Sequence, residues 1–62
     1  MIAIARNDNH APFYFKGEEY KVVRSYKGEN LDGENVRFYV VKDELGIESD
    51  IEEGCDFLDI KE

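Results

Sequence analysis

Apolar and polar residues alternate along short stretches of the chain, as they do in strands that bury one face. The strongest stretch is Val36–Lys42, which carries apolar residues on both faces and predicts a central strand covered on two sides. Tyr20–Tyr26 is rich in β-branched and aromatic residues, and Ile47–Ile51 alternates regularly. Phe13–Phe15 and Phe57–Ile60 are shorter extended runs. The pattern therefore predicts a protein built from short strands.

Turn-forming residues separate these stretches at intervals of about 8–12 residues, the spacing of all-β barrels and sandwiches. We expect Asn7–Pro12 to be a loop, Lys27–Asn35 a hairpin loop and Asp43–Gly46 a turn, because these segments are rich in Asn, Asp and Gly. No segment keeps apolar residues at helical spacing over three turns. Ser49–Glu52 has the spacing of a helix-capping box and Gly54 suits a left-handed helix end, so at most one helical turn is expected there.

The chain has 62 residues without repeats or linkers, and we expect a single domain over residues 1–62. A domain of this size buries only about 60% of its unfolded surface, so it has few residues to spare for a buried active site. It holds one cysteine, Cys55, and one histidine, His10, so that neither an internal disulfide nor a metal-ligand set is expected. The residues predicted to supply most of the core are Val22, Phe38, Val40, Ile47, Ile51, Phe57 and Leu58.

Three segments in this order resemble the small SH3-like barrels of Gram-positive bacteria and their phages. They are Lys16–Val22 (KGEEYKV), Val36–Gly46 (VRFYVVKDELG) and Asp56–Ile60 (DFLDI), with a polar hairpin between the first two. The resemblance implies a five-stranded barrel that serves as a binding platform. The chain lacks Trp and the Ala-Leu-Tyr-Asp-Tyr motif of proline-binding SH3 domains, and it lacks the basic loop of the KOW type, so no ligand site transfers. The predicted fold class is an all-β, five-stranded SH3-like barrel with at most one short helical turn.

The formal net charge is −7, and the excess of acidic residues lies in the last third of the chain. Residues 43–62 contain nine acidic residues and one basic residue, whereas residues 1–42 contain six acidic and seven basic residues. Direct binding of nucleic acid is therefore not expected, because it requires a concentrated basic surface. A protein partner with a basic surface is the expected complement. The plainer interpretation, that the charge only keeps a small domain in solution, stays open.

Catalytic chemistry is not expected from this sequence. Cys55 and His10 are the only candidates for a nucleophile and its base. Nothing around them in the sequence indicates a stabilised thiolate or a third, orienting residue. The segment Asp50–Asp56 is acidic but lacks the alternating ligand spacing of a calcium loop. We therefore predict a protein without catalytic residues, metal ions or cofactors.

Tyrosines that neighbour phenylalanines in the expected strands are candidates for a contact surface. If Phe13, Phe15 and Phe38 face the core, then Tyr14 and Tyr39 point to the opposite side. Tyrosine is favoured at protein interfaces, although these side chains can equally cover the second face of a barrel. The predicted partner-binding residues are Tyr14, Tyr26, Tyr39, Glu48, Asp50, Glu52, Glu53 and Asp56.

The leading functional hypothesis is a non-catalytic protein-binding module, and the resemblance to phage domains adds the hypothesis that it modulates a host protein. One alternative is that the acidic third mimics a nucleic-acid backbone and blocks a DNA- or RNA-binding protein. Another is self-association into a homodimer, in which the apolar segment Met1–Ala5 adds to a neighbouring sheet. This segment is too short for a signal peptide or a membrane span, so we expect a cytoplasmic protein without membrane contact, with Cys55 reduced.

Overall fold

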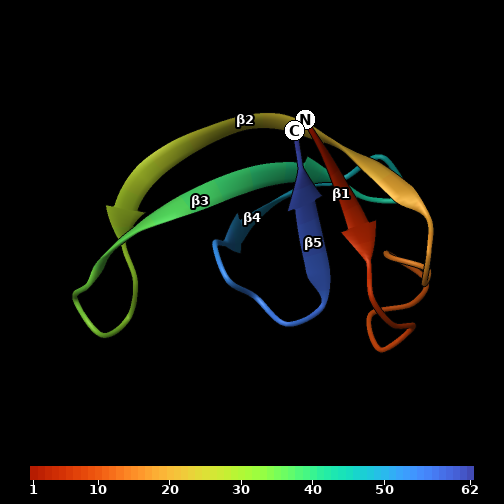
Figure 1. Cartoon of the computed structure of the whole chain (residues 1–62), viewed down its shortest axis with the longest axis horizontal. Helices are drawn as coiled ribbons and strands as arrows, with labels where there is room; N and C mark the ends of the chain where they lie inside the picture. The colour runs from red at the N-terminus through yellow and green to blue at the C-terminus, as the bar shows by residue number, and fades with distance from the viewer.

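The computed structural model describes residues 1–62 and contains five β-strands and no helix. The strands are β1 (Ile2–Ala5), β2 (Glu19–Glu29), β3 (Asn35–Lys42), β4 (Glu48–Glu52) and β5 (Leu58–Lys61). They form one sheet in the order β4-β3-β2-β1-β5, in which every neighbouring pair is antiparallel (Figure 1). β4 and β5 are therefore the two edges of the sheet. The structure has no helix of the length and apolarity needed to cross a membrane.

This strand order confirms the predicted small all-β, five-stranded SH3-like fold, with one correction. β4 and β5 do not pair, so the sheet curves round without closing into a barrel. The single helical turn that the sequence allows there does not form, because Ile51 and Glu52 complete β4 and the chain then turns at Glu53 and Gly54. Gly54 does adopt a left-handed conformation, with φ of +84°, but it follows a strand rather than a helix.

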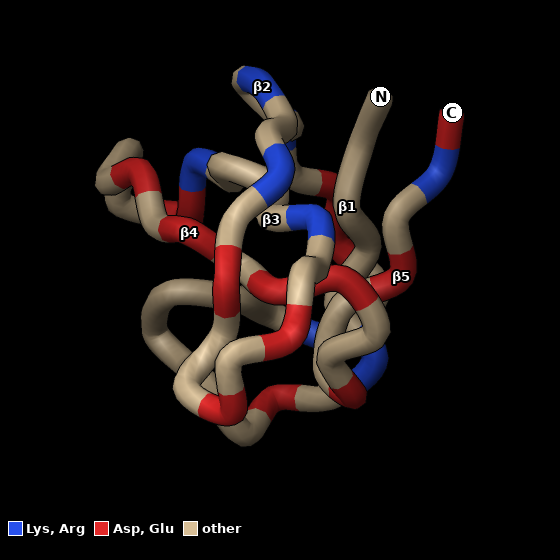
Figure 2. Tube along the Cα trace, turned by 90° about the vertical axis from the view of Figure 1, so that its left-hand side faces the viewer, with Lys and Arg blue, Asp and Glu red and all other residues tan.

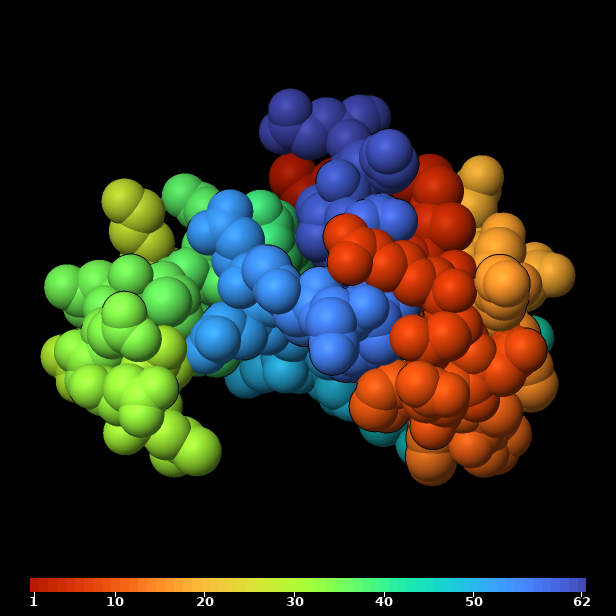
Figure 3. All heavy atoms as spheres, turned by 60° about the horizontal axis from the view of Figure 1, so that its bottom comes forward, coloured from red at the N-terminus to blue at the C-terminus, as the bar shows by residue number.

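A bulge in the longest strand curves the sheet. β2 pairs with β1 through residues 19–21 and with β3 from Val22 onward. The register shifts between Val22 and Arg24, which leaves Val23 as the extra residue, 40% exposed. A bulge bends its strand and increases the local twist. β2 consequently arches over the other strands, and its second part forms with β3 a hairpin that projects from the body (Figure 1, Figure 3).

The N-terminal segment forms an inner strand of the sheet. β1 pairs with β2 on one side and with β5 on the other. Ala3 and Ala5 are 0% and 2% exposed, and their small side chains let this strand lie in the middle of the core. The expectation that Met1–Ala5 is free to add to a neighbouring molecule is wrong, because both sides of the strand are already paired. Residues 13–15, which were expected to be extended, lie in the β1–β2 loop.

The core fills the inner face of the curved sheet. Val22 and Leu58 belong to it as predicted, and Ile51 and Phe57 pack against it. The other core positions are taken by two alanines, three tyrosines and one valine. The complete cluster is Ala3, Ala5, Tyr14, Tyr20, Val22, Tyr39, Val41 and Leu58.

Two residues predicted for the core lie elsewhere. Phe38 is on the outer face of β3, because Tyr39 points inward. Val40 shares this outer face but is buried as predicted, at 2% exposed, outside the inner cluster. Ile47 follows the β3–β4 turn and is 53% exposed. Both faces of β3 carry apolar residues, so alternation alone does not say which face is the inner one. Choosing the wrong inner face places every side chain of the strand on the opposite side of the sheet.

Aromatic residues of the β1–β2 loop and of β3 also face opposite to the prediction. Tyr14 is 5% exposed, and Tyr39 in β3 is 9% exposed, so the prediction that both are exposed contact residues is wrong. Tyr14 packs edge-on against Tyr20, with ring centroids 5.1 Å apart. Phe13 and Phe15 are instead 42% and 38% exposed. In a chain without tryptophan, the tyrosine rings supply the large side chains that fill the core.

Candidate functional site

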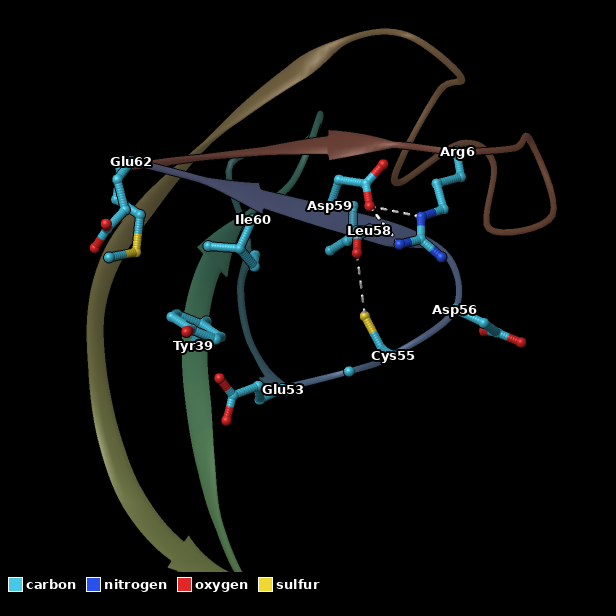
Figure 4. Close-up of a pocket in the computed structure, with 11 residues that line it drawn as sticks. Arg6, Tyr39, Glu53, Cys55, Asp56, Leu58, Asp59, Ile60 and Glu62 are labelled. Atoms are coloured by element: carbon cyan, nitrogen blue, oxygen red, sulfur yellow. Dashed lines mark hydrogen bonds and ion pairs between the residues drawn. The ribbon is translucent and has the colours of Figure 1, made fainter.

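A groove runs along the free edge of β5, where the sheet fails to close against β4 (Figure 4). Its volume is about 500 Å³. The walls come from β5, from the loop that connects β4 to β5, and from the inner face of β3. The groove therefore exists because the strand order leaves two edges unpaired.

The inner part of the groove is apolar. Tyr39 contributes its ring from β3, while Leu58 and Ile60 contribute from β5 (Figure 4). Cys55 lies in the loop, where its thiol donates a weak hydrogen bond to the carbonyl oxygen of Leu58, 3.8 Å from Sγ. Cys55 is unpaired and partly buried, and it acts as a small apolar wall residue.

The rim of the groove is acidic. Glu53, Asp56, Asp59 and Glu62 line it together with a single base, Arg6 (Figure 4). Arg6 Nε donates to Asp59 Oδ1 at 2.7 Å, and a second guanidinium nitrogen contacts the same oxygen. This hydrogen bonding, together with the positive charge of Arg6, lowers the pKa of Asp59. Arg6–Asp59 is the only ion pair in the protein, so the other three carboxylates are not neutralised.

The acidic residues predicted for the site divide between this rim and β4. Glu48, Asp50 and Glu52 alternate along β4, share its outer face and are all exposed. Glu53 and Asp56 lie on the rim. None of the five forms an ion pair. Acidic residues predominate along β4 and in the lower part of the view in Figure 2, whereas β2 and β3 carry basic residues above them. The structure thus places the predicted acids in two groups, three on the outer face of β4 and two on the rim of the groove.

Tyr26 is the one predicted tyrosine that reaches the outer surface, and it joins the acidic row. Its ring stacks on Phe38, with centroids 5.4 Å apart and an interplanar angle of 22°. The guanidinium carbon of Arg24 lies 5.5 Å from the centroid of the Tyr26 ring. The Tyr26 hydroxyl donates to Asp50 Oδ2 at 2.7 Å, and this hydrogen bond raises the pKa of Tyr26. Two residues of the predicted set are therefore in direct contact.

Comparison with family models, with curated proteins and with solved structures gives no match to this chain. The chemistry of the surface therefore has to be argued from its own residues.

His10 and Cys55, the candidate nucleophile–base pair, each contact other groups. His10 packs on Phe57, with ring centroids 4.0 Å apart, while the Cys55 thiol points to the Leu58 carbonyl. No three His, Cys, Asp or Glu side chains lie together as ligands for a metal ion. The surface offers charge, apolar contact and unpaired strand edges.

A second cavity, of about 280 Å³, lies between the β1–β2 loop and the β3–β4 turn. Phe13, Ile47 and Phe57 form its apolar walls. The Tyr14 hydroxyl is buried at this cavity without a hydrogen-bond partner, and burial raises the pKa of Tyr14. Asp43, which is 7% exposed, also lines it and uses Oδ1 to accept two backbone N–H groups of the turn, each at 2.9 Å. This cavity is smaller than the groove, and Asp43 is the one carboxylate that lines it.

Sequence reasoning missed the part of the site that belongs to β5. Asp59 and Glu62 lie in the acidic third, so their charge could have made them candidate site residues. Their position beside a groove could not be predicted, because the groove depends on the strand order. The partner of Asp59, Arg6, is 53 residues away in the sequence. Tyr39 does line the groove, but as part of its buried wall rather than as an exposed contact.

Proposed function

We propose that the protein is a non-catalytic module that binds a partner protein through the acidic surface of β4 and the groove rim. The observation that carries the proposal is a row of exposed carboxylates that no base within the protein neutralises. It comprises Glu48, Asp50 and Glu52 on β4, followed by Glu53 and Asp56 on the rim. A basic surface on the partner is the electrostatic complement of this row.

Fixed and uncompensated charges of this kind favour binding over a purely solubilising role. Lys42 lies directly opposite Glu48 in the β3–β4 pairing, yet the two form no ion pair. Because the carboxylates are held on a strand, their spacing is set before the partner arrives, which reduces the entropy lost on binding. Arg and Lys residues on a partner would gain attraction from the whole row, and this speeds association and selects the orientation.

Tyr26 supplies the aromatic contact of the proposed surface. Its ring and that of Phe38 place apolar area beside the Asp50 carboxylate. The resemblance to SH3-like binding platforms is in keeping with such a use, and with a phage-encoded protein that modulates a host protein. The free thiol of Cys55 is in keeping with a cytoplasmic location.

The test is capture of a partner from bacterial lysate at low salt, with two matched variants of the immobilised protein. The first carries Glu48→Gln, Asp50→Asn, Glu52→Gln and Glu53→Gln. The second carries Glu18→Gln, Glu19→Gln, Glu29→Gln and Asp32→Asn, which removes the same number of charges from exposed positions outside the site. We expect the first variant to bind the partner at least about tenfold more weakly and with a weaker salt dependence, and the second to bind it nearly as well as the original protein. Equal binding by all three proteins would disprove the role of the acidic surface.

The regular spacing of the β4 acids supports a second candidate function, mimicry of a nucleic-acid backbone. Glu48, Asp50 and Glu52 project from one face of a strand at intervals of about 6.8 Å, twice the rise per residue. A cleft that binds successive phosphates would accept such a row. A competition experiment separates the two functions. If this protein occupies the nucleic-acid site of its partner, an oligonucleotide should displace it. If it binds elsewhere on the partner, the complex should stay intact.

A further inference from the structure

We infer that the groove binds an extended segment of the partner as a sixth strand, added to the free edge of β5 and alternating apolar with basic residues. This inference rests on the proposed function, because it names the part of the partner that the acidic rim receives. It differs from a purely electrostatic contact in requiring backbone hydrogen bonds to β5.

The backbone of β5 presents unpaired groups to the groove. Leu58 and Ile60 lie opposite the two alanines of β1. The next position of the ladder is a hydrogen-bonded pair, since the N–H of Arg6 donates to the carbonyl of Phe57 at 2.9 Å. Hydrogen-bonded and non-hydrogen-bonded pairs alternate along an antiparallel ladder. Leu58 and Ile60 therefore point their N–H and C=O groups away from β1 and toward the groove.

Contacts on either side of Leu58 agree with this assignment. Ala5, its partner in β1, turns its own backbone groups the other way: its N–H donates to Glu18 at 3.3 Å and its carbonyl accepts from Gly17 at 2.8 Å. On the groove side, the Leu58 carbonyl meets the Cys55 thiol (Figure 4). A thiol is a weak donor, so a strong backbone acceptor is left without a strand to pair with.

The free edge of β4 does not offer an equivalent site. The N–H of Glu53 donates to the carbonyl of Arg37 at 2.8 Å, which by the same alternation means that the backbone groups of Glu48, Asp50 and Glu52 face away from β3. The Glu52 carbonyl is already occupied, because it accepts the N–H of Cys55 at 3.2 Å. These three residues line no cavity. Charged side chains along an edge also hinder the addition of a strand. Strand addition is therefore assigned to β5, where a groove accompanies the edge.

The groove also determines the residues of the added strand. A residue directly opposite Leu58 or Ile60 would share their inner face and meet Tyr39 and Cys55, so it should be apolar. A residue opposite Asp59 would share its outer face beside the acidic rim, so it should be basic. The expected recognition element is an extended apolar–basic–apolar sequence, bound in the manner of other peptides that add to sheet edges.

The charge of the rim argues against a second copy of this chain as the occupant. Pairing β5 with β5 would bring together two rims on which Glu53, Asp56 and Glu62 are not neutralised. Each molecule also carries a net charge of −7. A segment with Lys or Arg would be attracted to the rim, whereas a second copy of this chain would be repelled by it.

The test uses the full chain and synthetic peptides. The probe is a short fluorescein-labelled peptide in which valine and lysine alternate, titrated at low salt and followed by fluorescence anisotropy. Two further peptides carry N-methyl groups on the valines alone or on the lysines alone, so they share one charge and one composition. In the proposed complex the valine N–H groups face β5 and the lysine N–H groups face away. We expect the N-methylvaline peptide to bind at least about tenfold more weakly and the N-methyllysine peptide to bind within about twofold of the parent. The amide of Ile60, a residue that is only partly buried in the free protein, should become protected from hydrogen exchange.

Each of the other outcomes overturns the inference in a distinguishable way. Equal binding of the two methylated peptides would indicate attraction by charge without strand addition, and would leave the proposed function standing. Equal binding of a peptide that alternates valine with glutamate would contradict both. Absence of peptide binding, alongside a partner captured by the acidic surface, would refute strand addition alone. Concentration-dependent sedimentation, with protection of the Ile60 amide that rises with protein concentration, would assign the groove to a second copy.

Discussion

The inner face of the sheet buries three tyrosines, whereas the outer face of β2, β3 and β4 combines one tyrosine with a phenylalanine and a row of carboxylates. On the inner face, the ring of Tyr20 lies in the core and its hydroxyl has two partners. It accepts the N–H of Phe15 at 2.7 Å and donates to Glu44 Oε2 at 3.1 Å. On the outer face, the Tyr26 hydroxyl has one partner, Asp50, and its ring lies at the surface.

The difference shows how a small chain without tryptophan fills its core with tyrosines while charged side chains stay exposed on the outer face. The inner tyrosines supply the volume that Ala3 and Ala5 leave open, and they pack among residues far apart in the sequence. On the outer face Val40 is buried, whereas the carboxylates of β4 are exposed and form no ion pair. Substitutions on the inner face should therefore change stability, and those on the outer face should mainly change binding.

Truncating one apolar residue on each face should separate these roles most clearly. Leu58 is 3% exposed in the core, so Leu58→Ala should lower the free energy of unfolding by about 3 kcal/mol. Phe38 is only half-buried, and Phe38→Ala should lower it by about 1–2 kcal/mol. Urea unfolding followed by circular dichroism measures both. A larger loss for Phe38→Ala would mean that the outer cluster, rather than the core, holds the fold together.

Removing single hydroxyl groups from two inner tyrosines should give effects of opposite sign. Tyr20→Phe deletes a hydroxyl with two hydrogen bonds and should lower the free energy of unfolding by about 1–2 kcal/mol. Tyr14→Phe deletes a buried hydroxyl without a partner and should raise it by up to about 1 kcal/mol. Each variant is the control for the other, since the ring is kept in both. A loss of stability in Tyr14→Phe would show that this hydroxyl is hydrogen-bonded in solution.

The strands and turns were largely predictable because they depend on local sequence. β3 and the turn at residues 43–46 match their predicted positions within a residue. β-Branched residues favour extended backbone, and Asn, Asp and Gly favour turns, at their own positions in the chain. The faces of β3 were not predictable, because Phe38 and Tyr39 are both large and apolar. The choice between them is made by contacts with Tyr20 and Leu58, far away in the sequence.

The candidate site also has a part that was predictable from local sequence and a part that was not. The carboxylates of β4 were predictable, because a cluster of charges is visible in composition and stays exposed when the chain folds. The groove was not, because it requires knowing that β1 is an inner strand and that β5 is an edge. Nothing in residues 1–5 alone distinguishes a central strand from a free apolar segment. Their pairing depends on segments that lie later in the chain.

On the outer face, the effect of a single charge should be seen in the titration of Tyr26. Its hydrogen bond to Asp50 raises the pKa, so the neutral hydroxyl is favoured and the bond persists until the pH rises through the folded-state pKa. Asp50→Asn should bring this pKa back toward the usual value of about 10 with little change in stability. Ultraviolet absorbance of tyrosinate measures the titration, and Tyr26→Phe identifies its contribution. An unchanged pKa in Asp50→Asn would show that the two side chains do not interact in solution.

The smallest effect is expected within β5, where Leu58 faces the core and its neighbour Asp59 faces outward beside Arg6. Arg6 lowers the pKa of Asp59, so this carboxylate stabilises the fold above its unfolded-state pKa of about 3.9. The contribution is lost as the pH falls through the folded-state pKa. Asp59→Asn should therefore lower the melting temperature slightly at neutral pH, and the difference should disappear in acid. Because the pair is exposed, added salt should shrink the difference as well.

The matched control for this last comparison is Asp56→Asn, which removes a rim carboxylate that forms no ion pair. It should leave the melting temperature nearly unchanged at neutral pH, because no partner is lost. Thermal unfolding of the original protein and both variants, recorded from neutral to acidic pH, supplies the comparison. If Asp59→Asn lowers the melting temperature by the same amount at every pH, the cause would be altered packing of β5 rather than loss of the Arg6 pair. The outer side of this strand would then contribute to stability by contact alone, as its inner side does through Leu58.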